Sequence, residues 1–179
     1  MTMTHDQKIK ASDLLRKSGA YSLPVDLNAV AKYLKIRILY EDFEDNISGL
    51  LVVKNGKHAI GVNKNHHPNR QRFTIAHEIG HFVLHHKDGE HRKNDIHIDK
   101  KWAYFRAAGR GQEIDAQEWQ ANQFAADLLM PEELVKQSIK KSALNLTDDF
   151  DIYQLASMLQ VSEQAVTIRL VHLGIIEPY

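Results

Sequence analysis

Residues 73–83 read FTIAHEIGHFV, and this stretch decides the central element of the fold. Its apolar residues recur at helical spacing, which predicts a helix over residues 70–86. His77 and His81 lie four positions apart, so on a helix they share nearly one face. Two imidazoles at that spacing can reach one ion at Zn–N distances of about 2.0–2.1 Å. The stretch therefore predicts a mostly buried helix that carries a metal site.

Glu78 directly follows the first of these histidines, which makes the motif HExxH. On a helix Glu78 is turned about 100° from His77, but its long side chain can sit beside the water that a zinc ion would activate. A general base must stand there to take the water's proton. The neighbouring residues are apolar, and burying two histidines and a glutamate among them needs a compensating partner. This disfavours the alternative of a solvated helix that carries the motif by chance.

A catalytic zinc site needs a third protein ligand and an open position. The metzincin pattern would place its third histidine six residues after His81, but Lys87 stands there. Glu118 is the expected third ligand, because it begins a helical stretch whose later apolar residues face the core. Glu113 is the alternative, although its place at the helix start favours a solvated carboxylate. Asn122, one turn after Glu118, is expected to accept a hydrogen bond from a ligand imidazole and fix its tautomer.

The other histidines fit lesser roles. His85 lies one further turn along the helix and is expected to point past the metal, in a packing or rim position. Five more are interpreted as surface or loop residues: His66, His67, His86, His91 and His97. Three residues are candidates to stabilise the oxyanion on the substrate carbonyl, and spacing does not choose among them: His97, Tyr104 and Arg106.

Composition narrows the possible classes of protein. The 179 residues hold 23 basic and 23 acidic side chains and no cysteine. Disulfides, thiolate metal sites and a cysteine nucleophile are therefore excluded, and a balanced charge gives no bulk attraction to nucleic acid. No apolar run approaches the ~20 residues of a membrane span, and the N-terminus lacks the core of a signal peptide. We expect a cytoplasmic protein.

Flanking patterns predict an α+β fold with a small antiparallel or mixed sheet. Asn55-Gly56 separates two apolar stretches and is typical of a tight hairpin turn. This hairpin, residues 50–62, is expected to supply an edge strand that holds a substrate extended. The other expected elements are a helix over 8–18, a helix opened by Pro24, a strand over 36–41, a long loop over 87–112, a helix over 113–129 and a helix opened by Pro131.

The tail has the outline of a helix-turn-helix. Its expected small core is Leu155, Ala156, Val161, Val166 and Leu170, with Ser162 as the N-cap of the second helix. The outward residues of that helix would be Glu163, Gln164, Thr167 and Arg169. One acid and one base give little attraction to phosphate, so a structural appendage or a repressor-docking surface is favoured over direct DNA binding.

Two stretches resemble the ImmA/IrrE family of metallopeptidases. They are residues 70–85, RQRFTIAHEIGHFVLH, and residues 118–131, EWQANQFAADLLMP, with weaker similarity at 23–27 and 155–174. The resemblance implies a gluzincin-like zincin fold and one Zn²⁺ per chain, bound by His77, His81 and Glu118, with Glu78 catalytic. It also implies a protein substrate, a helix-turn-helix transcriptional repressor, whose cleavage derepresses phage, mobile-element or stress genes.

The expected organisation is a zincin-like domain over residues 1–142 and a helix-turn-helix-like segment over 143–179, packed on the first. The alternative function is a non-proteolytic, zinc-stabilised regulatory module that binds a repressor or DNA. Glu78 favours the enzyme, because a purely structural zinc site has no use for a base and closes its fourth position.

Overall fold

A computed structural model describes residues 5–86, 94–99, 116–146 and 148–178 of the chain. The helices are α1 (His5–Ser18), α2 (Leu27–Tyr33), α3 (Pro68–His81), a π-helical turn η1 (Phe82–His86), α4 (Ala116–Leu129), α5 (Glu132–Lys141), α6 (Asp149–Leu159) and α7 (Glu163–His172). The strands are β1 (Ile36–Glu41), β2 (Gly49–Lys54), β3 (Lys57–Asn63) and β4 (Asn94–Asp99). The fold is α+β, as predicted.

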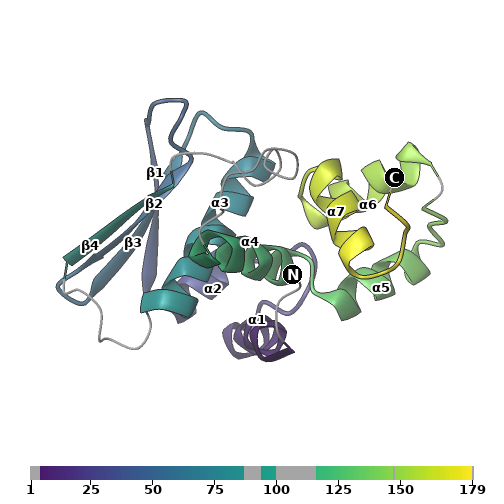
Figure 1. Cartoon of the computed structure of the whole chain (residues 1–179), viewed down its shortest axis with the longest axis horizontal. Helices are drawn as coiled ribbons and strands as arrows, with labels where there is room; N and C mark the ends of the chain where they lie inside the picture. Colours follow the sequence, from purple (N-terminus) through teal and green to yellow (C-terminus); the bar gives the residue numbers. More distant parts are fainter. Residues whose placement is uncertain (1–4, 87–93, 100–115, 147, 179) are drawn as a thin grey trace.

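The elements form successive layers (Figure 1). The sheet lies at one side, α3 and α4 pack beside it in the middle, and α5, α6 and α7 form a helical group at the far side. One face of the sheet packs against the helices through alternate residues of its strands, because successive side chains of a strand point to opposite faces. Buried members of that face are Ile36, Leu51, Ile60 and Val62.

The sheet is mixed and has the strand order β1-β3-β2-β4. β1 runs parallel to β3, whereas β2 is antiparallel to both β3 and β4. The predicted hairpin is confirmed, and Asn55 and Gly56 take the positive φ angles of its turn, 50° and 71°. The prediction that this hairpin supplies an edge strand is wrong, since both of its strands are interior. Of the strands that the structure describes, β1 and β4 form the edges.

β4 lies inside the stretch that was expected to be a loop. Its two isoleucines alternate with charged and polar residues, and its pairing with β2 supplies the partner that so short a stretch needs. His97, expected in a loop, therefore belongs to a strand, where it pairs with Leu51. The side chain of His97 lies outside the described part of the chain, as do Tyr104, Arg106 and the alternative ligand Glu113.

The second helix begins later than predicted. Pro24 follows a cis peptide bond and precedes the helix, which starts at Leu27. Asp26 is its N-cap, and the carboxylate accepts hydrogen bonds from the backbone N–H groups of Asn28 and Ala29. Pro131 likewise stands at the N-cap of α5 rather than inside its first turn.

The two tail helices have the predicted core and cap. All five expected core residues are buried, and the Ser162 hydroxyl accepts a hydrogen bond from the N–H of Ala165. Arg169 was expected to face outward, and this is wrong. It is 4% exposed, forms an ion pair with Asp127 of α4 at 2.6 Å, and donates from Nε to the Met130 carbonyl.

That ion pair joins α7 to α4. The tail therefore packs against α4, one of the two helices in the middle layer. The proposed boundary at residue 142 stays a prediction. Within the described residues, no helix has the length and apolar character required to cross a membrane.

Candidate metal centre

Three side chains from two helices meet at one point. His77 and His81 come from the last turns of α3, and Glu118 comes from the first turn of α4. Each offers one ligand atom, and these atoms all lie within 4.8 Å of one another. Both histidines are buried, whereas the Glu118 side chain is 34% exposed. The cluster is therefore reached from the Glu118 side.

The distances suit a tetrahedral ion. Zn–N distances of about 2.0–2.1 Å imply that the ligand atoms of a tetrahedral site lie roughly 3.4 Å apart. The two Nε2 atoms are 3.0 Å apart, and the carboxylate oxygens of Glu118 lie 3.4 Å from His77 Nε2 and 3.1 Å from His81 Nε2. Nitrogen and oxygen donors of this kind are also those that zinc accepts. The three residues fit a zinc ion.

Glu118 is held in its ionised form. Burial raises the pKa of this carboxyl, but the neighbouring His77 and His81 side chains outweigh that effect and leave the pKa well below its usual range. A metal ligand must be deprotonated to bind. The carboxylate is therefore in the form that a cation needs.

Asn122 lies one turn after Glu118 and contacts the other side of the His77 ring. Its Oδ1 is 3.0 Å from His77 Nδ1. An amide oxygen only accepts, so Nδ1 carries the proton and donates it. The neutral ring then presents an unprotonated Nε2 to the cluster, which is the tautomer that a metal requires.

Gly80 explains how α4 comes so close to α3. A Cβ atom at this position would lie 3.0 Å from the Ala121 carbonyl oxygen and 3.4 Å from Phe124 Cβ. Ordinary residues at a helix crossing would keep the two backbones further apart. Because Ala121 lies between Glu118 and Asn122, this close approach brings both of them against the histidines.

Glu78 lies fully buried beneath the same surface of α3, at 0% exposure. It faces the sheet at Gly49, where an added Cβ would stand 3.9 Å from Glu78 Oε1. That Cβ would also clash with Thr74 Cγ2 and with the Gly61 carbonyl oxygen. Gly49 thus lets β2 pack against α3 beside the carboxylate. Sequence patterns do not single out Gly49, because the side chain that requires its small size belongs to Thr74, 25 positions later in the chain.

The α-helix is followed directly by a π-helical turn after the last histidine of the cluster. α3 ends at His81, and residues Phe82–His86 form the π-helical turn. π turns of this kind recur at functional sites, because the extra residue redirects side chains. His85 lies in this turn with its ring centroid 5.8 Å from that of His81, and it is not a member of the ligand cluster.

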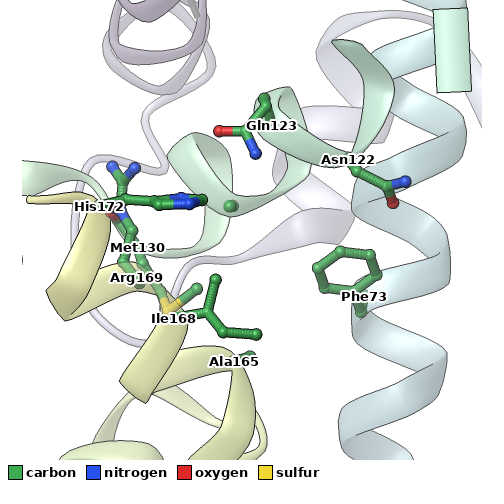
Figure 2. A pocket seen from close by; sticks show the side chains of 9 residues that line it. Phe73, Asn122, Gln123, Met130, Ala165, Ile168, Arg169 and His172 are labelled. Carbon is green, nitrogen blue, oxygen red and sulfur yellow. Dashed lines mark hydrogen bonds between the residues drawn. The ribbon is translucent and has the colours of Figure 1, made fainter. Parts of the chain in front are cut away.

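A small cleft lies on the other side of Asn122, between α4 and α7 (Figure 2). Phe73 and Asn122 stand at one end of it, and Arg169 and His172 stand at the other. Its cavity volume of about 20 Å³ accommodates roughly one water molecule. The cleft is therefore too small to receive a peptide side chain.

The fold and the cluster define a class of protein: an α+β domain in which two helices hold a partly buried His–His–carboxylate site beside a small mixed sheet. The peptidase M78 family model, described as the IrrE N-terminal-like domain, matches residues 31–171, and the chain belongs to this family. The predicted family is confirmed. The chain is thus a member of a peptidase family, and three of its side chains form a triad that could bind a metal ion.

The same fold is found among solved structures. A Mycobacterium tuberculosis transcriptional regulator aligns with a TM-score of 0.60 at 19% sequence identity. The match covers 94% of this chain and 47% of that one, so the chain spans about half the length of the regulator. No curated protein matches the chain.

Proposed function

We propose that this chain is a zinc-dependent endopeptidase of the gluzincin type. The observation that carries the proposal is the convergence of His77, His81 and Glu118 within 4.8 Å, with the Glu78 carboxylate in the same helix. A structural zinc site is closed by four protein ligands. Among the described residues this cluster has three, and the Glu118 side chain is 34% exposed, as a site open to water and substrate requires.

Each side chain has a role in the proposed reaction. His77, His81 and Glu118 would hold one zinc ion, and Asn122 fixes the tautomer of His77. An ion held there would supply a lowered pKa of water and polarisation of a peptide carbonyl. Glu78 takes the proton of the attacking water and then delivers it to the leaving amine. His97, Tyr104 and Arg106 remain the candidates that hydrogen-bond the developing oxyanion.

The substrate that we propose is a helix-turn-helix transcriptional repressor, and its cleavage would release the genes that it represses. Membership of the IrrE-like family supports this. The structure that aligns with this chain is called a transcriptional regulator, which agrees with a regulatory setting. Both hairpin strands are interior, and β4 is the edge strand next to β2. An extended substrate would therefore pair with β4 and not with the hairpin.

Metal content tests the ligand set. The wild-type chain should carry one zinc per chain and lose peptidase activity on chelation, and one equivalent of zinc should restore it. His81→Ala and Glu118→Ala should each fail to retain zinc in dialysis followed by metal analysis. Glu113→Ala is the matched control, because it removes the alternative carboxylate and should keep full zinc. Loss of zinc in Glu113→Ala with retention in Glu118→Ala would reverse the assignment.

A further inference from the structure

Edge strand β1 has an outer side that no described strand covers. It is paired on one side only, with β3. The Lys64 N–H donates to the Glu41 carbonyl on that side, at 2.9 Å. Backbone groups of a strand alternate in direction, so Arg37, Leu39 and Glu41 point theirs toward β3. Ile38 and Tyr40 therefore direct their N–H and C=O groups outward, where another strand can pair with them.

Two large apolar side chains of β1 are exposed to solvent. Leu39 and Tyr40 are 37% and 53% exposed, and they are two of the five large apolar residues that stand exposed in the described part of the chain. Natural proteins protect such edges with charges, proline or a covering element. An edge that no described strand covers, and that joins outward backbone groups to exposed apolar side chains, is suited to pairing with another strand.

Charge is distributed unevenly along the same edge. A groove of about 370 Å³ borders the start of β1 and is lined by Lys32, Lys35 and Arg37, with no acidic residue in its lining. The other end of the strand carries Glu41, followed by Asp42, which forms an ion pair with Lys64 at 3.0 Å. Arg37 and Glu41 thus stand near opposite ends of the edge, and a second copy in antiparallel orientation brings each of them opposite its counter-charge.

We propose that two copies of this chain pair through β1 in antiparallel fashion about a two-fold axis at Leu39, and so join their sheets. Such an interface presents the same patch from both subunits. In this register Ile38 pairs with Tyr40 of the second copy, and both direct their backbone groups outward, as a hydrogen-bonded pair requires. Arg37 stands opposite Glu41 of the second copy in a close, non-hydrogen-bonded pair.

This register places suitable side chains of the two copies opposite each other. Leu39 meets its own counterpart on the outer face of the sheet, and Tyr40 of the second copy lies over Ile38 beside the basic groove. An axis at Ile38 would also align the outward backbone groups, but it would place Arg37 opposite Leu39. Opposite charges in a cross-strand pair stabilise, whereas like charges directly opposite destabilise. The charges therefore select the axis at Leu39.

Cross-linking tests the register directly, since the chain has no cysteine of its own. Leu39→Cys should place two Cα atoms about 4.5 Å apart, inside the range that a disulfide spans. Arg37→Cys is the matched control, because four residues of offset separate its two copies by roughly 14 Å. Under mild oxidation Leu39→Cys should form dimers about tenfold faster or more than Arg37→Cys. Equal rates would overturn the register.

Charge reversal tests the same pairing without new chemistry. Arg37→Glu and Glu41→Arg should each raise the dissociation constant of the dimer about tenfold or more in sedimentation equilibrium, since both symmetric pairs become repulsive. A mixture of the two variants should recover association, because every Arg–Glu pair is then restored. Lys141→Glu, an exposed change far from β1, should leave the dimer unchanged.

Three outcomes would overturn the proposal. The first is a wild-type chain that stays monomeric up to millimolar concentration. The second is a dimer that is indifferent to both charge reversals. The third is a monomer whose β1 edge captures an unrelated extended peptide in place of a second copy. Tyr40→Pro offers a further check, because it removes an outward N–H and no bond to β3; it should abolish dimers while leaving the circular dichroism spectrum unchanged.

Discussion

His77 has two ring nitrogens with different partners, and this division sets what the site can bind. Nδ1 donates to Asn122, so Nε2 is left unprotonated toward His81 and Glu118. The same interaction fixes the plane of the ring. A side chain outside the ligand set therefore controls both the protonation and the direction of one ligand.

Removing that acceptor should weaken metal binding without removing a ligand. Asn122→Ala should lower zinc affinity about 10–100-fold, because His77 loses the partner that holds its tautomer and its orientation. Competition with a chromogenic chelator measures this. Gln120→Ala on the same helix is the control and should bind zinc as tightly as the wild type. Unchanged affinity in Asn122→Ala would refute the role.

Arg169 and Asp127 form the other residue-scale feature, a buried ion pair in which each side chain is 5% exposed. Arg169→Met should lower the free energy of unfolding by about 3–5 kcal/mol, because it leaves the Asp127 charge buried and unpaired. Urea denaturation measures the loss. The double variant Arg169→Met with Asp127→Leu should regain most of it, since neither charge is then left alone.

Arg16 provides the matched control for this pair. It forms an ion pair with Glu133 in which the two side chains are 55% and 67% exposed. Arg16→Met should cost about 1 kcal/mol or less, because water screens an exposed pair. Similar losses in Arg16→Met and Arg169→Met would show that burial does not govern the strength of these pairs.

At the element scale, the crossing of α3 and α4 builds the site. Gly80→Ala tests whether the two helices cross this closely, because it changes the free energy of unfolding through two effects of opposite sign. Helix propensity alone favours alanine by about 1 kcal/mol, whereas the new Cβ would lie 3.0 Å from the Ala121 carbonyl oxygen. We expect the crowding to prevail, with unfolding easier by about 1–3 kcal/mol and weaker zinc binding. Thermal unfolding and zinc titration measure both effects; a more stable variant would contradict the close crossing.

Several elements could be predicted because their signals are local. The apolar spacing of residues 73–83 predicts α3, Asn55-Gly56 predicts the hairpin, and Ser162 predicts the start of α7. The four-residue spacing of His77 and His81 is also local, so the candidate site could be located before any contact was known. The role of Glu118 was harder to predict, because its distance from the two histidines depends on the packing of α4 at Gly80.

Other features depend on contacts between distant residues, and these were missed. β4 has only six residues, and the residues of β2 that pair with it lie 40 to 50 positions earlier. The buried state of Arg169 requires Asp127, on another helix, and an arginine on a short amphipathic helix is ordinarily placed in solvent. Pro24 predicts a helix start, but Asp26, two positions later, is the N-cap in the structure, because its carboxylate accepts from the backbone N–H groups of Asn28 and Ala29.

At the scale of the whole molecule, the buried Arg169 changes what the tail can do. Without it, the outward residues expected on α7 are Glu163, Gln164 and Thr167, which offer no positive charge to phosphate. We expect no salt-sensitive binding of duplex DNA through α7, because such binding needs cations that displace counterions, and none of these three residues is a cation. Fluorescence anisotropy from about 50 to 200 mM salt measures it. Tight binding that weakens steeply with salt would contradict this.

The central claim is that Glu78 is the base of a zinc peptidase, and one comparison tests it most directly. Wild type and Glu78→Gln, each loaded with one zinc per chain, are incubated with a helix-turn-helix repressor, the substrate class proposed above. We predict the same zinc content in both, with cleavage by the wild type and a rate at least ~100-fold lower in the variant. Equal cleavage by both proteins, or none by the zinc-loaded wild type, would contradict the account.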